Sequence, residues 1–257
     1  MNTSAEADWR SRNLPRGTVR PAPLQRRARA RSRAFTRIEL ACVVCTLALL
    51  AAVIVPVLAG GDPRSERVIC ANNLRQIGLA FQLWGHDHSD LSMFEVPASS
   101  GGTRMHALAP NVWLHFAWLS NELATPQWLF CPTDTGQPAR DFSDDPGGGY
   151  LHPNFAGNAT SYFLTHPFEP VPRGLISGDR NVRVESPIGC SRFINAWRVP
   201  TIPLPSSAFG WTNGLHGSAG NVLHQDGSVE QLSNPGLRQA VIDAHADNGN
   251  LHIITPR

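Results

Sequence analysis

The chain has 257 residues, enough for one large domain or two small ones around a real hydrophobic core. Hydrophobic residues make up 42% of it, which excludes a wholly disordered protein, and 22 glycines with 21 prolines exclude a coiled coil. The net charge of +2 hides an asymmetry, because ten of the 22 basic residues, all arginines, lie in residues 1–37.

The N-terminal segment 1–33 is rich in Arg, Pro and Ala, has no apolar periodicity and is predicted to be disordered. With only Glu6 and Asp8 against its arginines, the stretch 1–37 carries +8, and the remainder carries −6. An arginine-rich tail is typical of nucleic-acid binding, but it also marks the cytoplasmic side of a membrane span. The apolar run that follows favours the second interpretation, so we expect no nucleic-acid partner.

The run Leu40–Leu58 contains 19 residues without a charge, and the chain has no second run of this kind. As a helix it would be about 28 Å long, close to the roughly 30 Å hydrocarbon core of a bilayer. It therefore predicts one membrane span, with the N-terminus in the cytoplasm by the positive-inside rule. Glu39 stands at the edge of this span, where a carboxylate is costly and needs an explanation.

The segment Ala34–Leu40 (AFTRIEL) resembles the processing site of type IV prepilins and type II secretion pseudopilins. The resemblance implies cleavage between Ala34 and Phe35 by a prepilin peptidase and N-methylation of Phe35. It implies that Glu39 serves methylation and assembly by pairing with the amino terminus of a neighbouring subunit. The alternative is a signal anchor that is never cut, since the family usually has Gly at the position of Ala34 and an aliphatic residue at that of Arg37.

The same resemblance implies a pilin-like α+β fold. It divides the chain into a cytoplasmic leader (1–34), a transmembrane N-terminal helix (35–59) and an extracytoplasmic domain with an antiparallel sheet (62–257). The expected location is the cytoplasmic (inner) membrane, as a single-pass protein that assembles into a filament.

A second helix is predicted after the span, with Asp62 as its cap and Pro63 at its first position. Over residues 64–84 the apolar side chains recur at helical spacing and form one face, at Leu74, Ile77, Phe81 and Trp84. Cys70–Ala80 (CANNLRQIGLA) also resembles the segment C-x-N-N-L-K-Q-I-G-L-A that follows the span in pseudopilin-like proteins.

The middle of the chain is less regular. Residues 111–116 and 127–130 fit short strands or turns of helix, and 132–160 is a loop rich in Pro, Gly, Asp and Asn. Strands are predicted at 160–165 and 193–199, with a turn at 178–181 between them.

The C-terminal part predicts a hairpin of two strands, 220–225 and 228–232, around Asp226 and Gly227. An Asp-Gly pair between extended runs favours a type I′ turn. A helix is predicted at 235–246 with Asn234 as its cap, followed by a last strand at 251–255.

Trp211–Val229 resembles the H-X9-DG domain that accompanies prepilin-type leaders, in which the motif residues are His216, Asp226 and Gly227 and the hairpin region is 211–232. Other segments have counterparts in the same proteins, namely Cys131–Asp134 (CPTD), Ser161-Tyr162 and Gly178–Asn181 (GDRN).

Two chemical interpretations of His216 and Asp226 remain open. They could form an acid–base pair, or Asp226 could hold a calcium ion with backbone carbonyls. The structural interpretation is that His216 hydrogen-bonds across the hairpin, while Asp226 is there because the turn favours Asp-Gly. We expect the structural role, with no catalytic residue and no cofactor.

Cys42 and Cys45 lie in the predicted span, and three further cysteines lie outside it, where they allow one internal pair. The family resemblance implies that Cys70 pairs with Cys131 and that Cys190 stays free.

Together these features predict a non-enzymatic, pilin-like subunit of a type II secretion pseudopilus or a related type IV filament. The implied partners are the prepilin peptidase, other pilin-like subunits and the inner-membrane assembly machinery. The alternative is a membrane-anchored extracytoplasmic binding domain that does not polymerise. A third hypothesis is an anchored hydrolase that uses His216 and Asp226.

Overall fold

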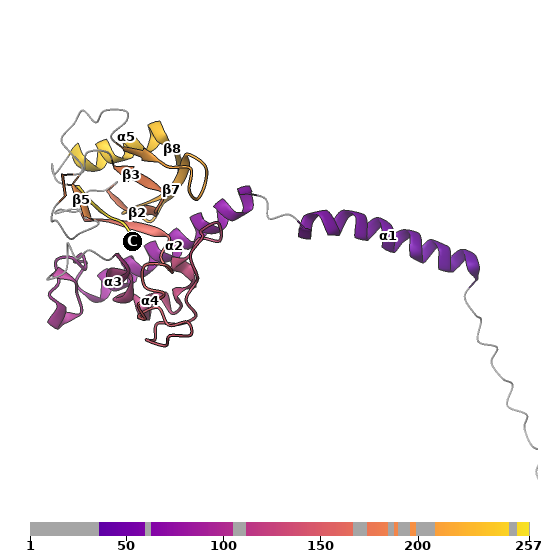
Figure 1. Cartoon of the computed structure of the whole chain (residues 1–257), viewed down its shortest axis with the longest axis horizontal. Helices are drawn as coiled ribbons and strands as arrows, with labels where there is room; N and C mark the ends of the chain where they lie inside the picture. Colours follow the sequence, from indigo (N-terminus) through magenta and orange to yellow (C-terminus); the bar gives the residue numbers. More distant parts are fainter. Residues whose placement is uncertain are drawn as a thin grey trace, which may run out of the picture. The chain divides into compact units, whose positions relative to one another are not determined.

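The computed structural model describes residues 36–59, 63–104, 112–166, 174–184, 188–189, 196–198, 209–246 and 251–256. Figure 1 shows how the helices and strands are arranged within each part of the chain. The predicted leader, its cleavage site at Ala34 and Phe35, the predicted cap Asp62 and Cys190, which was predicted to stay free, lie outside the described residues. The chain divides into two compact units, Met1–Val57 and Leu58–Arg257.

Helix α1 (Arg37–Ala59) begins with a reciprocal pair of side-chain caps. The Glu39 backbone N–H donates to the Thr36 hydroxyl at 3.2 Å, and the Thr36 N–H donates to the Glu39 carboxylate at 2.9 Å. This is a capping box, which satisfies two backbone donors at the helix start. Glu39 therefore has a local structural role, which the T-x-x-E spacing could have predicted.

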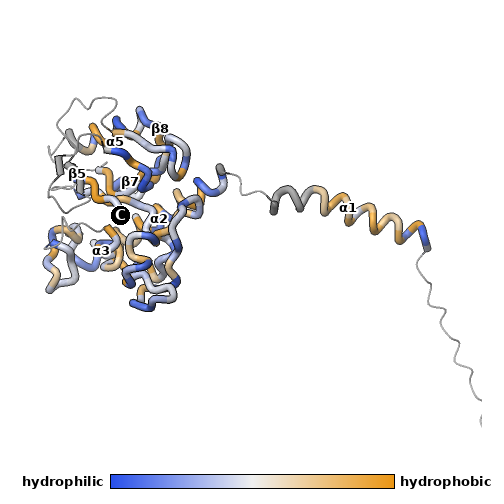
Figure 2. The backbone as a smooth tube through the Cα atoms, viewed as in Figure 1, coloured by the Kyte–Doolittle hydropathy of each residue, from blue (hydrophilic) through white to orange (hydrophobic). Residues whose placement is uncertain are grey.

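The described part of α1 carries its apolar side chains exposed, and Figure 2 shows the hydrophobic character of the helix. The side chains of residues 53–59 lie outside the described part. Across the described residues, no helix combines the length and the apolar character that crossing a membrane requires. The exposed large apolar side chains of α1 are Ile38, Leu40, Val43, Val44, Leu47, Leu49 and Leu50.

Helix α2 (Pro63–Asp87) starts at Pro63, as the sequence predicted, because proline needs no hydrogen-bond acceptor in the first turn. Leu74, Ile77 and Trp84 are buried, and Phe81 is partly buried against the same core. The predicted one-sided helix is confirmed.

The described strands of the C-terminal unit form a seven-stranded antiparallel sheet and a separate two-stranded one. Every neighbouring pair in the larger sheet is antiparallel, which confirms the α+β class with an antiparallel sheet. The larger sheet has the order β4 (Ile188–Gly189), β5 (Ala196–Arg198), β9 (His252–Ile254), β1 (Tyr162–His166), β2 (Leu175–Asp179), β7 (Ala219–His224), β8 (Val229–Ser233). The smaller sheet pairs β3 (Val182–Val184) with β6 (Phe209–Trp211).

Helices cover both faces of the larger sheet, and alternate residues of β1 point to opposite cores. Tyr162 and Leu164 belong to the same cluster as Leu74 of α2, whereas Phe163 packs in the cluster that contains Leu237 of α5. Figure 1 shows α2, α3 and α4 on one side of the sheet and α5 on the other. The bounds of these helices are α3 (Val112–Ala117), α4 (Ser120–Leu123) and α5 (Asn234–Ala246).

The ambiguous middle segments are turns of helix. Residues 112–117 form α3, and the 3-10 helix η3 (Pro126–Leu129) is capped by Thr125, whose hydroxyl accepts from the Gln127 N–H. The short 3-10 helix η1 (Ala98–Ser100) follows α2. The loop predicted at 132–160 contains no helix or strand longer than an isolated bridge between Asp141 and Gly149.

The turn predicted at 178–181 is only half correct, because Gly178 and Asp179 are the last residues of β2. Gly178 pairs with Phe163 on one side and Val222 on the other, so it lies inside the sheet. A β-carbon at this glycine would lie 2.7 Å from the Phe163 ring, so the residue marks a close approach and not a turn.

The hairpin of β7 and β8 is confirmed, but its predicted type I′ turn is wrong. Both central residues of that turn need positive φ, and among the described residues Gly227 has it (82°) whereas Asp226 does not. The Gly227 N–H donates to the His224 carbonyl at 3.0 Å, and the His224 N–H donates to the Ser228 carbonyl at 2.9 Å. This pattern is a three-residue loop that ends in a left-handed glycine.

Asn234 begins α5, but its side chain is used elsewhere than the sequence predicted. Its carbonyl oxygen accepts a hydrogen bond from the Trp211 backbone N–H at 2.5 Å, which ties α5 to β6. The predicted last strand is confirmed as β9, which lies between β5 and β1.

Candidate functional site

The sequence motifs of the C-terminal unit converge on one buried polar cluster. Cys70 comes from α2, Cys131 follows η3, Asp179 ends β2, and His216 lies in the loop between β6 and β7. All four are at most 6% exposed. Segments that are up to 146 residues apart in the sequence are thus brought together, because β2 and β7 are neighbours and α2 packs against β7.

Cys70 and Cys131 form a disulfide bond with a Cα–Cα distance of 5.2 Å, and this is the pair that the family resemblance implied. It ties α2 to the segment after η3. The Cys131 N–H donates to the Ser161 hydroxyl at 3.0 Å, and the Thr133 hydroxyl lies 3.0 Å from Cys131 Sγ. Cys42 and Cys45 of α1 are free and exposed.

The His216 ring packs between the disulfide and a carboxyl group. Its Nε2 lies 3.5 Å from Cys131 Sγ and 3.6 Å from Asp179 Oδ2. The Arg67 guanidinium donates to the His216 backbone carbonyl at 2.6 Å, which fixes the loop from the side of α2. These contacts lie outside the β7–β8 hairpin, unlike the predicted bond across it.

Asp179 was predicted as a turn residue in the GDRN segment, and it is the buried centre of the cluster. Its Oδ2 accepts hydrogen bonds from the Asn221 backbone N–H at 2.7 Å and from the Asn221 side-chain amide at 3.0 Å. Its Oδ1 is buried and has no hydrogen-bond partner among the described residues. A carboxylate with one unused oxygen in a buried site is energetically costly.

Burial controls the protonation of both groups. It raises the pKa of Asp179 to about 7, against the lowering effect of the Asn221 hydrogen bonds. It also lowers the pKa of His216 to about 4, and the nearby Arg67 charge acts in the same direction. At neutral pH His216 is therefore neutral, and its contact with Asp179 is not an ion pair.

A second set of hydrogen bonds, together with an ion pair, connects three of the motif segments. Asp134 of the CPTD segment accepts a hydrogen bond from the Ser161 hydroxyl at 2.6 Å and forms an ion pair with Arg180. Asn181 donates to the carbonyls of Thr212 and Ala219, at 3.1 Å each. The motif residues are thus used to hold loops onto the sheet.

Asp226 and Gly227 form the hairpin turn. Asp226 Oδ1 accepts hydrogen bonds from the Ser228 N–H at 2.9 Å and the Ser228 hydroxyl at 2.6 Å. Within the described part of the chain, the potential metal ligands that come within 4.8 Å of one another are Cys70, Cys131 and His216, and Asp226 is not part of this group.

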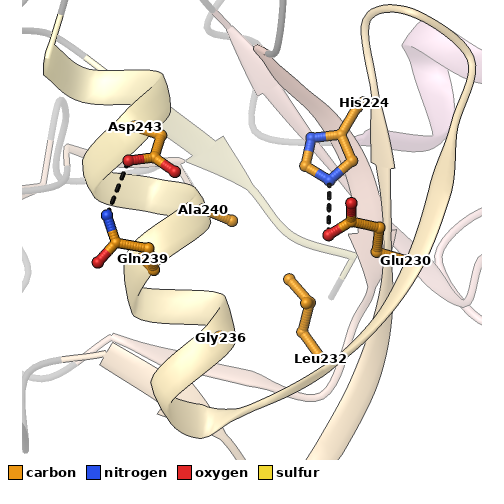
Figure 3. A pocket seen from close by; sticks show the side chains of 7 residues that line it. All are labelled: His224, Glu230, Leu232, Gly236, Gln239, Ala240 and Asp243. Atoms are coloured by element: carbon orange, nitrogen blue, oxygen red, sulfur yellow. Dashed lines mark hydrogen bonds and ion pairs between the residues drawn. The ribbon is translucent and has the colours of Figure 1, made fainter.

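A pocket of about 210 Å³ lies between α5 and the β7–β8 hairpin (Figure 3). Two pairs of interacting polar side chains line the pocket. His224 Nε2 lies 3.7 Å from Glu230 Oε2, and the Gln239 amide donates to Asp243 Oδ1 at 2.8 Å. No sequence motif indicated this pocket, because its residues come together only when α5 folds back over the hairpin.

Comparison with protein-family models, with curated proteins and with solved structures finds no match for this chain.

Proposed function

We propose that the protein is a non-enzymatic, pilin-like subunit that is anchored by α1 and assembles into a type II secretion pseudopilus or a related type IV filament. The observation that carries the proposal is the described surface of α1. Its exposed apolar side chains need a non-aqueous partner, because a soluble protein rarely leaves so much apolar surface in water. Lipid covers such a helix before assembly, and other subunits cover it in a filament.

The membrane span is proposed from the sequence. Leu40–Leu58 is free of charge, and its last residues belong to the part of α1 whose side chains are not described. The arginines before the span hold the N-terminus in the cytoplasm, and the domain from residue 62 lies outside. The prepilin peptidase, other pilin-like subunits and the inner-membrane assembly machinery are the proposed partners.

The cluster around the disulfide supports a structural and not a catalytic domain. His216, the residue on which a hydrolase would depend, has a side chain only 1% exposed, so a substrate would not reach it. Asp226 is engaged with Ser228 in its own turn. A disulfide also suits an oxidising compartment outside the cytoplasm.

The rival function is an anchored binding domain that does not polymerise, and the pocket of Figure 3 is the observation that favours it. The carboxyl groups of Glu230 and Asp243 suit a cationic ligand. The volume of the pocket, about 210 Å³, is, however, below the roughly 300–1,000 Å³ typical of small-molecule sites. We therefore favour assembly.

The test separates the two roles open to Glu39. In the capping box Gln can replace Glu, so Glu39→Gln keeps the helix cap and loses only the charge. If Glu39 pairs with the amino terminus of a neighbour, Glu39→Gln inserts into the membrane normally but is lost from sheared filaments, as Glu39→Ala is. Loss of one partner of a buried ion pair typically costs about 3–5 kcal/mol.

Thr36→Ala is the matched control, because it removes the cap partner of Glu39 and leaves the carboxylate. It should still enter filaments, since an N-cap contributes only about 0.5–2 kcal/mol. Normal incorporation of Glu39→Gln together with failure of Thr36→Ala would show that Glu39 is only a cap and would count against assembly through this residue.

A further inference from the structure

The residues around the disulfide have the chemistry of a metal site. The ligand atoms of Cys70, Cys131 and His216 all lie within 4.8 Å of one another, and they come from three separate elements. Asp179, on a fourth element, is not part of this group, but its Oδ2 lies 3.6 Å from His216 Nε2. Each of the four side chains is buried, so the group is shielded from competing water.

We propose that, when Cys70 and Cys131 are thiols, these two residues and His216 bind a zinc ion, with the Asp179 carboxylate as the fourth ligand. The disulfide and the metal are then alternative occupants of one cluster. The proposal does not depend on filament assembly, because its measurements concern metal and thiol content alone.

The two distances from His216 Nε2 fit tetrahedral zinc. With Zn–S of about 2.3 Å and Zn–N or Zn–O of about 2.0 Å, neighbouring ligand atoms in a tetrahedron lie roughly 3.3–3.8 Å apart. His216 Nε2 lies 3.5 Å from Cys131 Sγ and 3.6 Å from Asp179 Oδ2. The two sulfur atoms must also separate, which reduction of their bond allows.

Charge and ligand type also favour zinc. Two thiolates and one carboxylate bring three negative charges, which Zn²⁺ and the nearby Arg67 guanidinium balance. Calcium is disfavoured because it requires six to eight oxygen ligands, whereas thiolate and imidazole select zinc. A zinc ion would also give a further partner to the Asp179 carboxylate, whose buried Oδ1 has no hydrogen-bond partner among the described residues.

The chemistry balances in two steps. A phosphine takes up oxygen from water and delivers two electrons and two protons to the disulfide, which gives two thiols and a phosphine oxide. Zinc then displaces the two thiol protons and binds both thiolates. A newly made chain needs no reductant, because its cysteines begin as thiols. A small disulfide oxidant such as oxidised glutathione can take up two electrons from the two thiolates; the Cys70–Cys131 disulfide then forms, the oxidant leaves as two thiols, and the ion is released.

The test uses the full chain in mild detergent, unfolded in urea, reduced with a phosphine and refolded with excess Zn²⁺. After desalting we expect one zinc per chain, and Co²⁺ in its place should give a cobalt–thiolate charge-transfer band. Cys131→Ser and His216→Ala should each weaken zinc binding by at least about 100-fold, the upper end of the cost of losing an outer-shell partner.

Two controls make the result specific. The double variant Cys42→Ser/Cys45→Ser removes the thiols of α1, and His224→Ala removes a buried histidine outside the cluster, so both should retain the ion. The disulfide form should bind none, and zinc should slow re-oxidation of Cys70 and Cys131. A reduced wild type that retains no zinc, whether it refolds or not, would overturn the proposal. Equal retention by Cys131→Ser or by the disulfide form would also do so.

Discussion

Beside the disulfide, the buried carboxyl group of Asp179 and the buried imidazole of His216 respond to pH in opposite directions. The pKa of Asp179 is about 7 in the folded protein, above its ordinary 3.8, so its contribution to stability is largest below about pH 4 and is lost as the pH rises toward 7. The pKa of His216 is about 4, below its ordinary 6.5, so its contribution is full above pH 6.5 and is lost as the pH falls toward 4. In the disulfide-bonded wild type the two effects oppose each other.

Single substitutions should separate the pH effects of Asp179 and His216. Asp179→Asn leaves the His216 effect, so its free energy of unfolding should fall from pH 7 to pH 4 relative to wild type. His216→Gln leaves the Asp179 effect, so its free energy of unfolding should rise over the same interval. Arg67 and Asp134, which also act on Asp179, are unchanged in both. Urea unfolding at several pH values checks this, and parallel pH profiles for wild type and both variants would refute it.

The hairpin turn allows a second test at the residue scale. Gly227 has a φ of 82°, where a residue with a β-carbon costs roughly 1–2 kcal/mol, and a β-carbon there would also lie 2.8 Å from Gln82 Nε2. Gly227→Val should therefore lower the free energy of unfolding by at least this amount. Asp226→Asn should cost less than about 0.5 kcal/mol, since its carbonyl oxygen can still accept from the Ser228 N–H.

Thermal melts with and without chelator decide between this role and calcium binding. If Asp226 holds calcium, Asp226→Asn should be the harsher of the two substitutions, and chelator should reproduce its effect on the wild type. A chelator-dependent shift that disappears in Asp226→Asn would contradict the structural account of the turn.

At the scale of elements, the disulfide fixes α2 to the segment after η3. It joins residues 61 apart, so loop-closure entropy gives it a contribution of about 4 kcal/mol. The double variant Cys70→Ser/Cys131→Ser should lose about that much free energy of unfolding, whereas Cys42→Ser/Cys45→Ser should lose none. Peptide mapping under non-reducing conditions gives an independent check, and free thiols at Cys70 and Cys131 in the protein isolated from its native cell would contradict the assignment.

Elements whose signals are local were predictable from the sequence. The apolar spacing of Leu74, Ile77 and Trp84 predicted the buried face of α2, and the runs on either side of Asp226 predicted β7 and β8. The turn type was wrong because Asp-Gly also occurs where only the glycine is left-handed. The segment 111–116 was ambiguous because the helix found there, α3, has only six residues and is too short to show a period.

At the scale of the whole molecule, the buried cluster could not be predicted from spacing. Asp179 and His216 meet only because β2 and β7 are neighbours in the sheet, and no local pattern encodes that order. The family resemblance pointed to segments that contribute to the cluster but paired His216 with Asp226 in one motif, whereas the His216 ring contacts Asp179 and Cys131. The cluster therefore supports a rigid domain, which is compatible with the proposed role as a filament subunit.

The central claim is that the chain is matured as a prepilin, and mass spectrometry of the mature N-terminus tests it most directly. The full chain would be produced in its native cell, or with a prepilin peptidase, and its N-terminal peptide would be sequenced. The account predicts removal of residues 1–34 and a methylated Phe35 at the new terminus. An intact leader in the native cell, or cleavage after Ala59, would contradict it.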